Sequence, residues 1–300
     1  MPKCWGHRGA SADYPENTLA SFESAARAGV HGIESDVHIT SDDYILMFHD
    51  PELGRTTIGG SGSINTQPYK GNIENLVTSK KPEQKIPTFR ETIAWLNKPE
   101  NQHLEFNIDV KPNNDPTRLF TLMHEVLSSQ PDWETTLAPR IILGLWHPKF
   151  IAPALTILPQ VQRCFIGIDI YLAQRPAFWD SMHAYSIAFP MLASSEGQKF
   201  RERCRKEGKK VYTWTCNSQE QWAMAAKWEL DVVMTDTPIP YMLERAKVFQ
   251  LKKPIVPRDP WFMWKSLWYY PFVGWLARQL VWRRLERFGG PIAPYLGIKI

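Results

Sequence analysis

Short apolar runs rich in β-branched and aromatic residues alternate along the chain with longer segments of helical periodicity. We predict strands at 4–8, 32–39, 104–110, 140–146, 161–169, 185–192, 209–215 and 231–236. The intervening segments favour helices; one begins at Asn17 or Thr18 as N-cap and stops at Gly29, and another covers 88–98. This alternation predicts the α/β class and a (β/α)8 TIM barrel, whose active site would lie at the carboxyl ends of the strands.

Two segments depart from the alternation. The apolar run at 44–50 follows the strand at 32–39 so closely that we expect an antiparallel hairpin, because parallel strands need a longer crossover. Residues 51–86 are rich in Gly, Ser, Asn and Lys and have little periodicity, which predicts a loop-rich insertion over the barrel mouth. We divide the chain into a barrel domain at 1–250 and a C-terminal tail at 251–300.

Charge and tryptophan content distinguish the tail from the barrel. The chain has 300 residues and a net charge of +4, but the tail alone holds nine Lys and Arg against two acidic residues, which leaves the barrel slightly acidic. The tryptophans of the tail are Trp261, Trp264, Trp268, Trp275 and Trp282. Basic residues mixed with tryptophan are typical of segments that bind an anionic membrane surface, so we expect that partner and no nucleic acid.

Four of these tryptophans recur every seven residues and would form one stripe on a helix, at Trp261, Trp268, Trp275 and Trp282. The uncharged stretch between Lys265 and Arg278 has 12 residues and contains Pro271. A bilayer needs about 20 residues, so we expect the tail to lie on or dip into one leaflet. The alternative is a helix packed on the barrel.

The cysteines and the N-terminus bear on the compartment. The four cysteines have neither zinc-site nor disulfide spacing, which predicts free thiols, and no apolar segment marks the N-terminus for secretion. We expect an intracellular protein associated with a membrane, with mitochondrial, endoplasmic reticulum and lipid-droplet surfaces as candidates.

Pairs of polar residues interrupt two predicted strands. Glu34 and Asp36 are two residues apart and therefore face the same side, as do Asp109 and Lys111 on the next strand. Inward carboxylates repel one another unless a cation lies between them, and oxygen ligands suit Ca²⁺ or Mg²⁺. Lys111 could hold a phosphate oxygen. The alternative is one solvated and one structural carboxylate near the barrel rim.

Two histidines and an arginine suggest acid–base chemistry on a phosphate ester. His7 and Arg8 end the first predicted strand, and His49 ends the hairpin strand, where it could face His7. Arginine fits an oxyanion, and two histidines would supply one base and one acid. Alternatively, His7 and Arg8 are a surface pair and His49 caps a turn.

The remaining polar and aromatic candidates are predicted to be structural or uncertain. Trp214 either lines the pocket or belongs to the core. Asp236 fits a turn or cap carboxylate as well as a site residue and is left out of the predicted site. Six histidines have no carboxylate at a sequence spacing that indicates a functional pair, and we predict that they are surface or packing residues. They are His31, His38, His103, His124, His147 and His183.

Several motifs resemble the glycerophosphodiester phosphodiesterase family in order and spacing: "GHRG", "PENT", "IESDV", "FHDP", "IDVK", "VYTWTCN" and "VVMTDTP", between residues 3 and about 245. The resemblance implies that His7 and His49 are catalytic, that Arg8 clamps the phosphate and that Lys111 lies beside it. It also implies that Glu34, Asp36 and Asp109 bind the metal, although the family often has glutamate where this chain has Asp109.

Within the family, "RIILGLWHP", the short hairpin and the aromatic, basic tail are most similar to the fungal phosphatidylglycerol-specific phospholipase C branch. This likeness implies a metal-dependent phosphodiesterase that cleaves the glycerophospholipid phosphatidylglycerol to diacylglycerol and glycerol 3-phosphate. The alternatives are a glycerophosphodiesterase acting on soluble, deacylated diesters and a lipid-binding barrel without catalysis.

Overall fold

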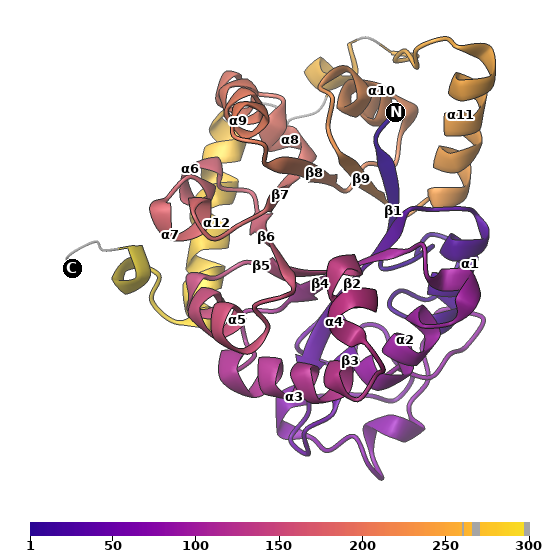
Figure 1. The fold of residues 1–300 in the computed structure, drawn as a ribbon, viewed down its shortest axis with the longest axis vertical. Coiled ribbons are helices and arrows are strands. Elements are labelled where there is room, and N and C mark those ends of the chain that lie inside the picture. The colour runs from indigo at the N-terminus through magenta and orange to yellow at the C-terminus, as the bar shows by residue number, and fades with distance from the viewer. Residues whose placement is uncertain (260, 266–270, 297–300) are drawn as a thin grey trace.

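The computed structural model describes residues 1–259, 261–265 and 271–296, and within them eight parallel strands close into a barrel (Figure 1). The barrel strands are β1 (Lys3–His7), β2 (Gly32–Ile39), β4 (Glu105–Val110), β5 (Ile141–Leu145), β6 (Gln162–Gly167), β7 (Ala184–Ala188), β8 (Lys210–Trp214) and β9 (Val232–Thr235). Pairing of β1 with both β2 and β9 closes the barrel. The predicted (β/α)8 TIM barrel is therefore confirmed, and each predicted strand overlaps an observed one.

Helices surround the barrel, and their ends follow the local sequence. The helices are α1 (Leu19–Arg27), α2 (Phe89–Leu96), α3 (Pro116–Ser128), α4 (Trp133–Thr136), α5 (Ile151–Ile157), α6 (Ile170–Ala173), α7 (Pro176–Trp179), α8 (Phe189–Leu192), α9 (Ser195–Lys206), α10 (Gln219–Lys227), α11 (Pro238–Leu251) and α12 (Pro271–Gly289). Thr18, not Asn17, caps α1 by accepting a hydrogen bond from the Ser21 amide. Thr88 and Glu91 form a capping box on α2.

One end of the barrel interior is filled by side chains, and the other is polar. At the filled end, the rings of Trp5 and Tyr212 pack with their centroids 4.8 Å apart. They belong to a buried cluster with Ile142, Val232 and Met234. A larger apolar core lies between the strands and the surrounding helices. The barrel is thus a packed core rather than a pore, and any ligand must enter from the polar end.

The insertion at 51–86 has a small apolar core of its own. β3 (Ile45–Met47) pairs antiparallel with β2, as the hairpin prediction required. The insertion contains the short 3-10 helices η1 (Ile64–Thr66) and η2 (Ile73–Asn75), and its buried residues include Leu53, Ile64 and Ile73. Lys80 Nζ donates hydrogen bonds to the carbonyls of Ser11 and Ala12, which joins the insertion to the loop after β1.

The tail does not carry the predicted single stripe of tryptophans. Trp261 precedes the 3-10 helix η6 (Phe262–Lys265), whereas Trp275 and Trp282 lie on the later helix α12; Trp268 lies outside the described residues. Within the described residues α12 begins at Pro271, and proline is tolerated in the first turn of a helix. No helix in the described ranges is long and apolar enough to cross a bilayer.

Part of the tail packs on the barrel. α12 lies beside the segments that follow β5, β6 and β7, where its neighbours are His147, Tyr171 and Met191 (Figure 1). Leu285 and Ile292 are buried in the main core, and His147 Nε2 lies 3.0 Å from the Gly290 carbonyl oxygen. The prediction that His147 is a simple surface or packing residue misses this role: it fastens the end of α12 to the loop after β5.

Candidate active site

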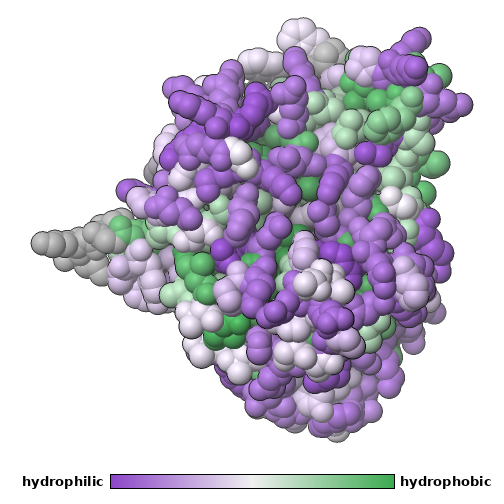
Figure 2. Space-filling view, viewed as in Figure 1, coloured by the Kyte–Doolittle hydropathy of each residue, from purple (hydrophilic) through white to green (hydrophobic). Residues whose placement is uncertain are grey.

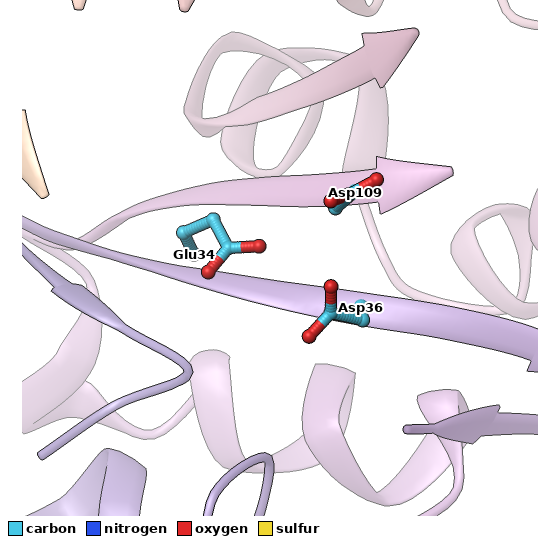
Figure 3. A group of neighbouring side chains, drawn as sticks. All are labelled: Glu34, Asp36 and Asp109. Carbon is cyan, nitrogen blue, oxygen red and sulfur yellow. The ribbon is translucent and has the colours of Figure 1, made fainter. Parts of the chain in front are cut away.

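Three carboxylates from neighbouring strands converge inside the polar end of the barrel. Glu34 and Asp36 project from β2 and Asp109 from β4, and one ligand oxygen of each lies within 4.8 Å of the others (Figure 3). All three are buried. Burial and the negative charge of Asp36 raise the pKa of Glu34 to about 8. An additional cation would relieve this repulsion, so the buried, oxygen-only cluster fits a hard divalent metal ion.

Lys111 neutralises the two aspartates of this cluster. Its Nζ lies 2.5 Å from Asp36 Oδ1 and 2.7 Å from Asp109 Oδ2. Burial alone would raise the pKa of Asp36, but Lys111 and then Arg8 hold it well below its usual range. Lys111 itself keeps a raised pKa despite burial, because Asp109 and Asp36 favour its charged form. Lys111 and Asp109 lie on the same face of the strand, as their spacing predicted, and the contact of Lys111 with a phosphate stays a prediction.

Arg8 reaches the same cluster from the loop after β1. Its backbone adopts a φ of 56°, and its amide donates to the Glu34 carbonyl and to Glu34 Oε2. Arg8 Nη1 donates to Glu16 Oε1 at 3.1 Å, and Nε lies 3.4 Å from Asp36 Oδ2. The buried Nε makes no hydrogen bond within the part of the chain that the structure describes. The charge of Arg8 offsets part of the negative charge of Asp36.

Asn17 positions a carboxylate instead of capping a helix. Its Nδ2 donates to Asp36 Oδ2 at 2.8 Å, while its Oδ1 accepts from Ser35 Oγ at 2.6 Å and from the Asp36 amide. Its backbone has a φ of 58°, which asparagine tolerates better than most residues. The "PENT" segment therefore contributes to the acidic cluster, and the N-cap role falls to Thr18 alone.

His7 has a carboxylate partner that the sequence prediction left out. His7 Nδ1 lies 2.7 Å from Asp236 Oδ1, and its Nε2 lies 3.8 Å from Glu34 Oε2. Asp236 also accepts hydrogen bonds from Ser11 Oγ and Asn217 Nδ2. Burial would raise the pKa of Asp236, but the hydrogen bond with His7, together with those from Asn217 and Ser11, lowers it to about 2. Asp236, which was left out of the predicted site, is therefore the hydrogen-bond partner of a predicted catalytic histidine.

The contact between Asp236 and His7 could have been predicted from closure of the barrel, which brings the last strand beside the first. Asp236 directly follows β9, and β9 pairs with β1 with Thr235 opposite Gly6. The residues that follow these two positions, Asp236 and His7, must therefore lie near each other at the same end of the barrel.

His49 is held by Asp50 and by a second histidine. Its Nδ1 lies 2.6 Å from Asp50 Oδ1, and its carbonyl oxygen lies 3.1 Å from His38 Nε2. Burial lowers the pKa of His49 to about 4, although Asp36 acts in the opposite direction. His38 is itself buried and receives Asn113 Nδ2 on its other ring nitrogen. The prediction that His38 is a simple surface or packing residue is thus incomplete, because it supports the backbone of His49.

These groups surround one small cavity of about 110 Å³. Seven of the eight predicted site residues line it, namely His7, Arg8, Glu34, His49, Asp109, Lys111 and Trp214. Asp36, the eighth, joins the cluster through its contacts with Lys111 and Arg8.

A tryptophan that the prediction overlooked completes the cavity. Trp146 Nε1 donates to Asp109 Oδ1 at 2.7 Å, and its ring meets that of Trp214 nearly edge-on, 5.7 Å between centroids. Trp214 Nε1 in turn donates to the Ser186 carbonyl. Trp214 is therefore a cavity residue as well as a packing residue.

Comparison with known proteins decides the family. The family model described as "Glycerophosphoryl diester phosphodiesterase family" matches residues 7–239. The chain belongs to this family. A glycerophosphodiester phosphodiesterase of Caldanaerobacter subterraneus is 26% identical over 242 residues, covering 77% of this chain and 93% of the relative. An uncharacterised protein of Bacillus subtilis, YqiK, is 27% identical over 249 residues, covering 79% of this chain and 96% of the relative.

Solved structures agree with this assignment. An Oleispira antarctica phosphodiesterase in complex with the product sn-glycerol-3-phosphate matches with a TM-score of 0.70 and 25% identity, over 81% of this chain and 97% of that one. A glycerophosphodiester phosphodiesterase from Agrobacterium tumefaciens shares the fold, with a TM-score of 0.65 and 20% identity, over 81% of this chain and all of that one.

Membership makes this chain a phosphodiesterase of a metal-dependent hydrolase family that cleaves glycerophosphodiesters. The motif resemblance is confirmed at the level of the family, and the fungal branch stays a prediction. The matched region ends at residue 239, before α12 and most of α11.

Proposed function

We propose that the chain is a membrane-associated phospholipase C that hydrolyses phosphatidylglycerol to diacylglycerol and glycerol 3-phosphate. The observation that carries the phosphodiester chemistry is the meeting of His7 and His49, each with a carboxylate on Nδ1, in one cavity with Arg8 and Lys111. A carboxylate on Nδ1 fixes the orientation of the ring and leaves Nε2 for the proton in transit.

Arg8 and Lys111 bind the non-bridging oxygens of the diester and neutralise its charge. Glu34, Asp36 and Asp109 would hold a divalent cation, which supplies further stabilisation of negative charge on the phosphate. Its oxygen-only ligands favour Ca²⁺ or Mg²⁺.

The two histidines move the protons. One histidine accepts the proton of the 2-hydroxyl of the headgroup glycerol as that oxygen attacks phosphorus. The other protonates the departing diacylglycerol oxygen, so a cyclic glycerol phosphate and diacylglycerol result. Water then opens the cyclic ester with the histidine roles reversed, which restores both protonation states and gives glycerol 3-phosphate.

The exposed apolar residues outside the matched region support a membrane-bound substrate. Trp261 is 65% and Phe272 69% exposed, and the tail holds nine Lys and Arg against two acidic residues. Figure 2 shows further hydrophobic side chains gathered over α11, where Leu243 and Phe249 are exposed. Tryptophan with surplus positive charge suits the interface of an anionic bilayer. All four cysteines are free and buried, consistent with the proposed intracellular location.

A soluble, deacylated glycerophosphodiester is the second candidate substrate, because the Oleispira relative was solved with sn-glycerol-3-phosphate, a product without acyl chains. A panel of phospholipid headgroups in mixed liposomes, assayed with and without chelator beside deacylated diesters, separates the candidates. Release of diacylglycerol from phosphatidylglycerol that chelator abolishes is expected. Turnover of deacylated diesters alone favours the second candidate, and turnover of no substrate favours a lipid-binding barrel without catalysis.

A further inference from the structure

A second cavity of about 270 Å³ adjoins the catalytic one. The two cavities share His49, Lys111, Trp146 and Trp214 in their walls. The catalytic cavity, at about 110 Å³, is the smaller of the two, so we expect a bulky substituent of the diester to extend beyond it. The shared lining residues place the second cavity next to the proposed phosphate site.

The far wall of this cavity is apolar and comes from α12. Val281, Leu285 and Phe288 follow one another at intervals of four and three residues, which places them on the same face of the helix. Pro112 and Ile168 complete the apolar lining on the barrel side. Arg284 lies in the same stretch of wall and its guanidinium stands 5.9 Å from the Phe288 ring centre.

Helix α12, which forms this wall, is fixed to the barrel by packing and by a hydrogen bond. Leu285 is buried in the main core, and the helix end is fastened by the contact of His147 with Gly290. Gly289 lies so close to the His147 ring that a Cβ there would stand 2.5 Å from its Cδ2. α12 lies outside the region that the family model matches, so this chain adds the wall to the common barrel.

We propose that α12 is a specificity element whose face holds the apolar substituent of the departing alcohol, and that the chain thereby selects lipid diesters over deacylated ones. The proposal rests on the phosphodiester hydrolysis proposed above. A small polar alcohol would leave the partly buried Val281 and Phe288 facing water, whereas an acyl chain would cover them, and each buried methylene adds to binding. The second cavity is therefore built for hydrocarbon next to a phosphate site.

The test compares two substrates with the same headgroup: phosphatidylglycerol with short acyl chains, kept below its aggregation threshold, and deacylated glycerophosphoglycerol. Phe288→Ala removes part of the wall, and Val281→Phe fills the cavity. Both variants should lower kcat/KM for the short-chain lipid on the order of tenfold and leave that for the deacylated diester within about twofold. Leu280→Ala, on the exposed side of the same helix, is the matched control and should change neither value.

The deacylated substrate also reports whether each variant is folded and has an intact phosphate site. Equal losses on both substrates, or no loss on the lipid in either variant, would overturn the role of α12. If the unaltered chain hydrolysed neither diester, the proposed phosphodiester hydrolysis itself would be overturned. Failure of the α12 proposal and failure of the proposed function therefore give different results.

Discussion

Replacing Asp236 by Asn tests whether this carboxylate, which lies outside the acidic cluster, controls His7. Asp236 Oδ1 stands 2.7 Å from His7 Nδ1, and the carboxylate is ionised at any working pH because its pKa is about 2. Asparagine keeps the size and can still accept a hydrogen bond, so the variant removes mainly the charge. Hydrogen bonds to charged groups contribute about 1.5–3 kcal/mol, which corresponds to a loss of roughly 10- to 10²-fold in kcat/KM.

The pH profile gives the more specific readout of this variant. The pKa of His7 is raised: burial lowers it, but Glu34 and the hydrogen bond with Asp236 outweigh that effect. Removing the charge of Asp236 must therefore lower the pKa of His7, and the limb of the pH–rate profile that His7 produces should move to lower pH whether His7 serves as acid or base.

Ser11→Ala is the control for Asp236→Asn. It removes the hydrogen bond from Ser11 Oγ to Asp236 Oδ1 at 2.9 Å but keeps the negative charge of Asp236. We therefore expect kcat/KM to fall about fivefold and the His7 limb of the pH–rate profile to stay in place. A folded Asp236→Asn enzyme with normal kcat/KM, or with its limb unmoved, would refute the pairing of Asp236 with His7 as a functional one.

The remaining predictions concern the histidines, the metal cluster and the tail. His7→Ala and His49→Ala should each keep the fold and lower turnover by on the order of 10² or more, and normal turnover in either purified variant would remove that histidine from the mechanism. Glu34→Gln should weaken metal binding, measured by titration calorimetry, together with activity; without metal it should not lower the melting temperature at pH 7, because burial disfavours the Glu34 charge. Replacing Trp261 and Trp264 by Ala should reduce binding to anionic vesicles in a flotation assay while hydrolysis of a soluble diester is unchanged, and equal flotation would argue against anchoring by these residues.

The barrel and the acidic cluster were predictable because both depend on short-range pattern. Strand periodicity of two places Glu34 and Asp36 on one face, and the parallel neighbour β4 brings Asp109 level with Asp36. The same period extends to His38, which was nevertheless set aside because it lacked a carboxylate partner. Its partners are a backbone carbonyl and Asn113, which residue spacing does not reveal.

The contacts that escaped prediction join residues distant in sequence. Asp236 meets His7 only because the last strand closes on the first, and Trp146 meets Asp109 across two adjacent strands. The packing of α12 on the barrel was kept only as the alternative, for a related reason. Positive charge argued against burial of the whole segment, yet α12 buries Leu285 while Arg283 and Arg284 stay exposed on neighbouring positions. Net charge over a segment does not decide which face of a helix packs.

The two faces of α12 connect the proposed membrane contact with the proposed specificity. One face lines the cavity with Val281 and Phe288, while Leu276 and Leu280 are exposed elsewhere on the helix. A bilayer that met these exposed residues would lie one helix diameter, about 10 Å, from the cavity, so a lipid would need to move little to reach the phosphate site. Deleting the tail would remove the cavity wall, core residues and exposed tryptophans at once. Single substitutions on separate faces are therefore the experiments that can tell membrane binding from substrate selection.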